Sequence, residues 1–345
     1  MTSTCSGSTI GPCAALTPTS SAGSAPACSA LDRGAHRTVT ATDVVGAVTV
    51  RTADPAGDEL HGGDAGSRFL PARDGVELHL LHWPTARGPW AVLVFLHGIA
   101  SHGGWFATTA ADLAGQGIAV YAPDRRGSGR SGGPRGHLDR YDQALEDLGL
   151  VLRMAAAEHP GTPVFLAASS WAAKLAVVHA ARPGPLAGLL LLGPGLLATV
   201  GLTPARQAAV VAGHLIRPRA RLPIPLTPEL YTPDPRYQAL IRADPLRLLT
   251  ATTSFFWQTS RLDRARGRAS AALRLPVLVL QGEADRMMDV PATRAWVDGL
   301  GAADTTYRSY PGAGHTLDFE PDRRRYLADL HGWLAARVPR GSPRP

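Results

Sequence analysis

Cysteine is scarce in this chain of 345 residues. Its three cysteines, Cys5, Cys13 and Cys28, all lie within the first 28 residues, so disulfides are not expected to hold the rest of the chain together. Long hydrophobic runs are also lacking, because no stretch reaches the roughly 18 consecutive apolar residues of a membrane-spanning helix. Hydrophobic residues still make up 45% of the sequence and charged residues 18%. These proportions predict one large domain, or two smaller ones, with a substantial core.

Positive charge is missing from the beginning of the chain, where the first basic residue is Arg33. The longest apolar run before it, residues 13–16, is far shorter than the apolar segment of about 7–15 residues in a secretory signal. We therefore expect a cytoplasmic protein. Residues 1–66 are rich in serine, threonine, alanine, glycine and proline, a composition typical of a mostly disordered tail. Within this tail, the alternating pattern of residues 38–52 predicts either a short strand or hairpin or an unpaired segment.

From Phe69 onward, short apolar segments alternate with amphipathic ones. The sequence predicts strands over residues 76–83, 90–96, 118–123, 164–168, 189–192, 277–281 and 305–310. It predicts helices over residues 105–116, 141–158 and 322–337, and others that begin after Ser170 and at Pro291. Nearly all-apolar strands separated by helices predict an α/β fold, with a mostly parallel sheet and helices on both faces. Residues 195–272 interrupt this alternation with helical stretches, so we predict a helical cap inserted into a core formed by residues 67–194 and 273–345.

A serine lies where one predicted strand turns into a helix. The segment VFLAASSWAAKLAVV, residues 164–178, places Ser170 at that corner. A nucleophilic serine in this setting usually has the pattern G-x-S-x-G, because the residues two before and two after it must be small. Around Ser170 these residues are Ala168 and Ala172. If the turn is too tight for the two extra methyl groups, the overpacking costs on the order of 1–3 kcal/mol.

Two other serines compete for the role of nucleophile. Ser131 matches G-x-S-x-G formally, but glycines and a proline follow it, so no helix begins there and we interpret it as a loop residue. Ser169 has the bulky Trp171 two residues after it. The sequence therefore favours Ser170, while an ordinary strand-to-helix turn without catalytic function stays open as the alternative.

A serine hydroxyl needs a base to take its proton and a carboxylate to orient that base. In folds with this kind of turn the three residues follow in the order serine, acid, histidine. Asp285 follows the predicted strand 277–281, and His315 follows the strand 305–310. Because the carboxyl ends of parallel strands meet at one edge of a sheet, we predict that Asp285 is the acid and His315 the base. Glu283 and Asp289, in the same acidic loop, are alternatives to Asp285.

The negative charge that develops on an attacked carbonyl oxygen needs backbone donors. One N–H is expected from Trp171, the residue after the nucleophile, and the other from the loop after the strand 90–96. In that loop Gly98 lets the backbone turn toward the site, so we predict Ile99 as the second donor. Lys174, the single lysine of the chain, lies one helical turn after Ser170, and we expect it to complete that turn rather than to approach the site.

Together these motifs resemble those of one family. From about residue 69 to the C-terminus, the chain is similar to the monoacylglycerol lipase and lysophospholipase branch of the α/β-hydrolase superfamily, also labelled serine aminopeptidase-like hydrolases. The matching motifs are His-Gly at 97–98 with a histidine at 102, D-x-x-G-x-G-x-S at 124–131, Ser-Trp at 170–171, Gly-x-x-Asp at 282–285 and Gly-His at 314–315. The resemblance implies the α/β-hydrolase fold and the roles already assigned. This chain departs from the family pattern at residues 168 and 172, where it has alanine and the family has glycine.

Basic residues are concentrated in the predicted cap. Residues 201–270 hold 11 arginines against four acidic residues, an excess that equals the formal net charge of +7 of the whole chain. Such a cap suits an anionic substrate or a peripheral contact with an acidic membrane surface. The simpler alternative is an arginine-rich surface that is only solvated. No nucleic-acid partner is expected, because no recognition motif accompanies the charge. Eight apolar residues of this segment are candidates to line an acyl pocket: Leu222, Ile224, Leu226, Leu230, Leu240, Phe255, Phe256 and Trp257.

The sequence thus predicts a serine carboxylic-ester hydrolase that forms an acyl-enzyme, with monoacylglycerols or lysolipids as the leading substrates. No metal and no organic cofactor are expected. Two alternatives stay open. One is an acyltransferase or thioesterase that uses the same three residues, and the other is a non-catalytic binding protein, which the alanines at positions 168 and 172 suggest.

Overall fold

A computed structural model describes residues 65–200, 203–321 and 323–338. The predicted tail lies outside the described residues except for positions 65 and 66, and so does the alternating segment 38–52. Eight strands form one sheet: β1 (Gly66–Pro71), β2 (Glu77–Trp83), β3 (Ala91–Leu96), β4 (Ile118–Pro123), β5 (Val164–Ser169), β6 (Leu186–Leu192), β9 (Val277–Gly282) and β10 (Thr305–Tyr310). Their order across the sheet is β1-β2-β4-β3-β5-β6-β9-β10. β2 pairs antiparallel with β1 and β4, and every other pair in this sheet is parallel.

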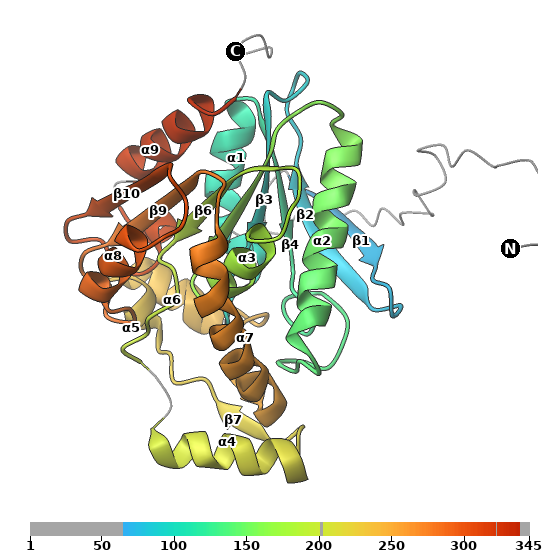
Figure 1. Cartoon of the computed structure of the whole chain (residues 1–345), viewed down its shortest axis with the longest axis vertical. Helices are drawn as coiled ribbons and strands as arrows, with labels where there is room; N and C mark the ends of the chain where they lie inside the picture. The colour runs from blue at the N-terminus through green and yellow to red at the C-terminus, as the bar shows by residue number, and fades with distance from the viewer. Residues whose placement is uncertain (1–64, 201–202, 322, 339–345) are drawn as a thin grey trace, which may run out of the picture. The chain divides into compact units, whose positions relative to one another are not determined.

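Helices cover both faces of this sheet (Figure 1). The first face packs against α1 (Ala107–Gly115) and α9 (Arg324–Ala335). The second packs against α2 (Tyr141–Glu158), α3 (Ala172–Ala180) and α8 (Val290–Asp298). The predicted α/β-hydrolase fold, a mostly parallel sheet between two helical layers, is confirmed.

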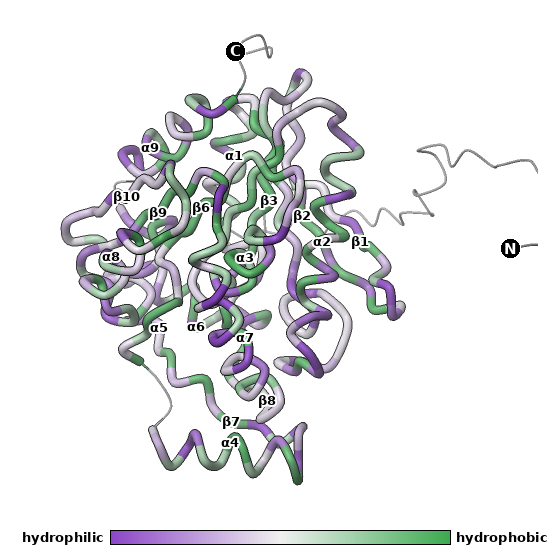
Figure 2. Tube along the Cα trace, in the orientation of Figure 1, coloured by the Kyte–Doolittle hydropathy of each residue, from purple (hydrophilic) through white to green (hydrophobic). Residues whose placement is uncertain are grey.

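The central strands are buried on both sides, which is why their sequences are almost entirely apolar. In β3, Val92, Val94 and Leu96 belong to one core cluster, while Leu93 and Phe95 belong to the other. Figure 2 shows the same hydrophobic character along β3 and β6. Burial of this middle part of the sheet fixes its register, because a shift by one residue would exchange the two sets of side chains.

Between β6 and β9 lies the segment predicted to be a cap. It holds α4 (Pro204–Ile216), β7 (Arg221–Pro223), α5 (Pro228–Tyr231), α6 (Pro235–Ala243), β8 (Thr250–Thr252) and α7 (Thr253–Ala272). Proline stands in the first turn of α4, α5 and α6, where its missing N–H costs no helical hydrogen bond. α7 packs against both α3 and α4, and α4 lies at the lower end of the view in Figure 1. Within the described ranges, no helix is long and apolar enough to cross a membrane.

Candidate active site

Ser170 occupies a strained turn between β5 and α3. Its φ of 51° is the one positive value found at a non-glycine residue in the described chain, a conformation that costs about 1–3 kcal/mol unless the surroundings enforce it. Here the enforcing contacts are backbone hydrogen bonds. The Ser170 N–H donates to the Leu192 carbonyl (3.1 Å), and the Ser170 carbonyl accepts from the N–H groups of Ala173 (3.0 Å) and Gly195 (2.8 Å). The turn is therefore held by β6 and by the loop that follows it.

The crowding around this turn comes from residues distant in the sequence. A methyl group built on Gly98 would lie 3.0 Å from Ser170 Cβ, and one built on Gly195 would lie 2.6 Å from the Ser170 carbonyl carbon. Ala168 and Ala172 are fully buried in the same place. The glycines that let the backbones approach are thus Gly98 and Gly195, and the turn accommodates alanine at the two positions where the sequence pattern usually has glycine.

Asp285 and His315 form a buried pair at the ends of β9 and β10. The Nδ1 atom of His315 lies 2.7 Å from Oδ2 of Asp285, and that oxygen also accepts from the Gln281 amide (2.9 Å). The other oxygen, Oδ1, accepts from the backbone N–H groups of Met287 (2.8 Å) and Met288 (3.2 Å). Burial by itself would raise the pKa of Asp285, but the charge and hydrogen bond of His315, together with these other donors, lower it below its ordinary value. The carboxylate form is therefore favoured next to the imidazole.

The two alternative acids have other partners. Glu283 accepts a hydrogen bond from the Ser309 hydroxyl (2.6 Å), and Asp289 accepts from the Ala292 N–H (2.9 Å) at the start of α8. Of the three acidic residues in this loop, Asp285 is the one that contacts His315.

One loop links Ser170 to His315. A methyl group on Gly193 would lie 2.6 Å from the His315 carbonyl oxygen and 3.4 Å from its Nδ1, and two residues later Gly195 donates to the Ser170 carbonyl. Within the described residues, no hydrogen bond joins the Ser170 hydroxyl to His315. The structure thus brings Asp285 and His315 together directly and places Ser170 beside them through the 193–195 loop.

Arg125, which sequence reasoning missed, contacts both predicted backbone donors. Its guanidinium donates to the carbonyl oxygens of Gly98 (2.7 Å) and Ile99 (3.1 Å) and, through Nε, of His97 (3.3 Å). It also lies 4.7 Å from the centroid of the Trp171 ring. In a trans peptide the C=O of Gly98 and the N–H of Ile99 point in opposite directions. Binding of that carbonyl by Arg125 therefore turns the Ile99 N–H away from the guanidinium.

The loop that carries Ile99 is also tied to the segment between β6 and β9. His102 forms an ion-pair contact with Asp244 (Nε2–Oδ2, 3.2 Å), and the Trp105 indole donates to the same carboxylate (2.8 Å). Burial alone would raise the pKa of Asp244, but the hydrogen bond and charge of His102 lower it. The resemblance had singled out His102 without indicating this partner, because Asp244 lies 142 positions further along the chain.

A cavity of about 490 Å³ opens at Ser170. Ile99 and Trp171 lie in its wall, together with Ile224, Leu226, Phe256, Trp257, Met287 and Met288. Four of the eight predicted acyl-pocket residues therefore line it, whereas Leu230 and Leu240 pack in a separate cluster. The expectation for Lys174 was wrong. Its side chain lines this cavity and forms an ion pair with Asp263 of α7, because α7 brings a carboxylate within its reach.

Ser131 has the structural role that its loop context indicated. Its hydroxyl donates to the Asp124 carbonyl (2.7 Å) and accepts from the His79 N–H (2.8 Å). A second serine–histidine–aspartate array lies beside it, in which Ser67 Oγ is 2.9 Å from His79 Nε2 and His79 Nδ1 is 2.8 Å from Asp124 Oδ2. Ser67 belongs to β1, and its φ is not positive. This array therefore has the side-chain spacing of a triad without the strained turn.

The described residues contain no cluster of three or more histidine, cysteine, aspartate or glutamate side chains arranged to hold a metal ion.

Known proteins resemble this chain in sequence. The family model described as "Serine aminopeptidase, S33" matches residues 87–322. A monoacylglycerol lipase of Mycolicibacterium smegmatis is 31% identical over 268 residues, which cover 76% of this chain and 95% of that protein. The human monoglyceride lipase is 29% identical over 274 residues, covering 77% and 89% of the two chains.

Solved structures show the same fold. The monoacylglycerol lipase of Paleococcus ferrophilus superposes with a TM-score of 0.68 at 24% identity, over 76% of this chain and 99% of that one. A monoglyceride lipase variant from Saccharomyces cerevisiae gives 0.70 at 19% identity, over 79% and 95%. The chain therefore belongs to the serine aminopeptidase S33 family, in the monoacylglycerol lipase branch of the α/β-hydrolases, and is a carboxylic-ester hydrolase.

Proposed function

We propose that Ser170, His315 and Asp285 act as a catalytic triad that cleaves an acyl ester. The observation that carries this proposal is the strained Ser170 turn beside the buried His315–Asp285 pair. Asp285 engages Nδ1 of His315, which leaves Nε2 as the nitrogen that takes the Ser170 proton. A hydrogen bond between Ser170 and His315 that forms only with bound substrate is common in enzymes of this kind.

The reaction follows from this arrangement. Ser170 Oγ gives its proton to His315 and bonds to the ester carbonyl carbon, and the N–H groups of Ile99 and Trp171 donate to the resulting oxyanion. His315 then passes the proton to the leaving alcohol oxygen as the C–O bond breaks, and an acyl group remains on Ser170. A water molecule then gives a proton to His315 as its oxygen bonds to the acyl carbon. The bond between that carbon and Ser170 Oγ breaks, and His315 returns the proton to Oγ. The products are a free carboxylic acid, an alcohol and the regenerated serine.

A single-chain lipid ester is the substrate class that we favour. Several curated relatives are named as monoacylglycerol or monoglyceride lipases, and one from Bacillus subtilis is named as a phospholipase. The apolar wall formed by Ile224, Leu226, Phe256 and Trp257 suits an acyl chain. Lys174, Asp263 and Gln207 line the same cavity and supply polar groups for a glycerol or phosphoglycerol leaving group.

We further propose that residues 195–272 act as a cap that contacts lipid surfaces. In the described chain, the exposed large hydrophobic side chains are Val211, Leu215, Ile216 and Leu249, and all four lie in this segment. Leu215 and Ile216 are 78% and 77% exposed at the end of α4, and Arg217 and Arg219 follow directly. Apolar side chains next to arginines suit the interface of an acidic membrane. The cytoplasmic location stays a prediction from the sequence.

The test is labelling with a fluorophosphonate probe followed by peptide mapping. Ser170 is expected to be labelled, and Ser170→Ala to reduce ester hydrolysis to a residual rate, because triad residues act as a unit. Ser67→Ala is the matched control, since Ser67 has a histidine–aspartate pair but no strained turn, and this variant is expected to keep full labelling. Label on Ser67, Ser131 or Ser169, or none on the folded protein, would contradict the proposal. Acyl transfer to an amine or release of coenzyme A would favour the acyltransferase or thioesterase alternative.

A further inference from the structure

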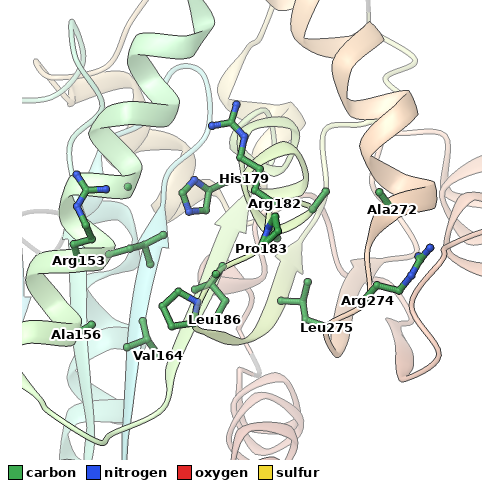
Figure 3. Close-up of a pocket in the computed structure, with 16 residues that line it drawn as sticks. Arg153, Ala156, Val164, His179, Arg182, Pro183, Leu186, Ala272, Arg274 and Leu275 are labelled. Atoms are coloured by element: carbon green, nitrogen blue, oxygen red, sulfur yellow. The ribbon is translucent and has the colours of Figure 1, made fainter. Parts of the chain in front are cut away.

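A second, larger cavity lies at the amino ends of the parallel strands, whereas Ser170 lies at their carboxyl ends. It has a volume of about 760 Å³, within the range of about 300–1,000 Å³ typical of ligand sites. Its floor includes Val164 and Leu186, the first residues of β5 and β6, and Leu275, which precedes β9 (Figure 3). Ser170 follows the last residue of β5, so about 20 Å of strand separates the two sites. We call this second site the base cavity.

The polar side chains of the base cavity are all basic. Arg153, His179, Arg182 and Arg274 line it, and none of its lining residues in the described chain is acidic. Figure 3 shows His179 between Arg153 and Arg182. Arg274 is engaged with the carbonyl oxygens of Ala271 (2.8 Å) and Leu273 (2.7 Å). No ion pair is found for the side chains of Arg153 and Arg182 within the described residues.

A glycine in the middle of α2 makes room for two of these groups. A methyl group on Gly149 would lie 3.1 Å from Arg153 Nη1 and 3.6 Å from His179 Cε1. Glycine in a helix interior costs about 1 kcal/mol relative to alanine, and here it lets the guanidinium and the imidazole approach one point. A guanidinium from α2 and an imidazole from α3 therefore converge at one point in the wall of the base cavity.

One ring nitrogen of His179 has no hydrogen-bond partner in the described chain. This atom, Nδ1, is buried. Burial, followed by the charges of Arg182 and Arg153, lowers the pKa of His179 to about 4. No carboxylate contributes to this shift. Within the described residues, the site therefore combines two arginines that have no acidic partner with an imidazole nitrogen that has no hydrogen-bond partner.

We propose that the base cavity binds a long-chain fatty acid. The carboxylate would lie among Arg153, His179 and Arg182, where its charge complements the two guanidinium groups and its oxygens come within reach of the imidazole. The chain would lie along Leu152, Val164, Leu186 and Leu275. The apolar walls favour an amphipathic anion over a bare inorganic one, since they supply most of the contact area. Binding here is separate from the Ser170 chemistry, although the proposed reaction releases such an acid.

The experiment uses the full chain carrying Ser170→Ala, so that no result depends on hydrolysis. Binding of hexadecanoate is measured by isothermal titration calorimetry, with hexadecanol as the uncharged chain of equal length and inorganic phosphate as the anion without a chain. The NMR signal of the His179 ring is followed in parallel. We expect hexadecanoate to raise the pKa of His179 by about one unit or more, because a nearby anion favours the protonated ring. Hexadecanol and phosphate should leave it unchanged.

Variants distinguish the base cavity from the cavity at Ser170, which also takes an acyl chain. Arg153→Ala with Arg182→Ala should weaken hexadecanoate binding at this site at least tenfold and abolish the His179 response. Arg73→Ala with Arg87→Ala removes the same net charge from exposed positions elsewhere and should change neither. Gly149→Leu, which fills the point of convergence, should act like the arginine pair. Undiminished binding in these variants, a silent His179, or equal affinity for the alcohol would overturn the proposal.

Discussion

Arg125 illustrates at the scale of a single residue how the site is assembled. The residue is 8% exposed, and its guanidinium donates to three successive carbonyl groups, those of residues 97–99. The same group lies 4.7 Å from the centroid of the Trp171 ring. Arginine suits this task because its planar fork presents several donors in a fixed geometry, whereas an ammonium is a point charge. We interpret Arg125 as a positioning residue for the backbone N–H groups of Ile99 and Trp171.

Replacement of Arg125 by lysine should therefore lower kcat and leave KM nearly unchanged. Loss of one oxyanion donor costs about 100–1,000-fold in kcat, and since Arg125→Lys misplaces a donor rather than removing it, we expect a decrease on the order of 10–100-fold. Steady-state kinetics on a short-chain ester measures both constants. Arg126→Lys is the control, because Arg126 binds Asp74 and Asp147 instead. A loss of similar size in the control, or a pure KM effect in Arg125→Lys, would contradict this role.

The three candidate triad residues that sequence reasoning identified share one property: each lies in the turn or loop that follows a predicted strand. Ser170, Asp285 and His315 were found because the ends of parallel strands meet at one edge of the sheet. Their proposed roles await the labelling experiment. Arg125 also follows a predicted strand, 118–123, but no local pattern marks it or Gly195 as part of the site. Their importance depends on contacts with residues distant in the sequence, which a single sequence does not encode in its local pattern.

At the scale of whole elements, α3 and α7 are joined by the Lys174–Asp263 ion pair. The side chain of Lys174 is 10% exposed and that of Asp263 35%. Burial lowers the pKa of Lys174, although Asp263 opposes this effect. The two charges therefore differ in how much they depend on the ion pair. The buried ammonium of Lys174 needs the negative charge of Asp263 to offset its lost hydration, whereas the carboxylate of Asp263 is still hydrated by solvent.

This inequality predicts an asymmetric response to mutation. Asp263→Asn leaves a buried ammonium without its counter-charge and should lower the free energy of unfolding by about 2 kcal/mol, below the full cost of breaking a buried pair because Asp263 is partly exposed. Lys174→Met should cost less than about 1 kcal/mol. The double variant should be close to Lys174→Met alone. Urea unfolding followed by circular dichroism gives the three values, and additive losses would exclude the coupling.

Elements were predictable where the local sequence has a clear character. The predicted bounds of α2, 141–158, of β4, 118–123, and of β10, 305–310, agree with the structure. α2 repeats its leucines at helical spacing and β4 is a short apolar run, while β10 is half-exposed but rich in threonine and tyrosine, which favour strands. β1 was missed, since its sequence GSRFLP shows little alternation and contains both glycine and proline, which are uncommon in strands. The β7–β8 ribbon was also missed, because each strand has three residues and is defined mainly by its partner.

At the scale of the whole molecule, the excess of arginine and the exposed large apolar side chains of the described chain lie in the same segment, between β6 and β9. The arginine excess of residues 201–270 was evident from composition alone, but no local pattern indicated that Leu215 and Ile216 would face solvent. Amphipathic periodicity in α4 indicates a buried face and an exposed one, and only the arrangement of α4 against α7 settles which residues are left uncovered. Figure 2 shows hydrophobic and hydrophilic residues alternating along α4.

The proposed membrane contact therefore has two separable components. Arg217→Gln with Arg219→Gln should weaken binding to vesicles that contain phosphatidylserine by about 30-fold at low salt, since each basic residue near an anionic surface contributes about 1 kcal/mol. The loss should shrink as salt rises, because the Debye length falls to about 8 Å at 0.15 M. Leu215→Ser with Ile216→Ser should weaken binding to neutral and anionic vesicles alike, with little dependence on salt.

Vesicle co-sedimentation across a salt series measures both components. Arg73→Gln with Arg87→Gln serves as the control, because it removes the same charge from exposed positions outside the cap, and its binding should match that of the unmodified chain. A control as weak as the cap variant would mean that net charge alone governs association. Equal salt dependence in the leucine–isoleucine and arginine variants would mean that α4 does not insert its apolar residues. Either result would contradict the proposed contact, because that contact requires both the local arginines and the inserted apolar side chains.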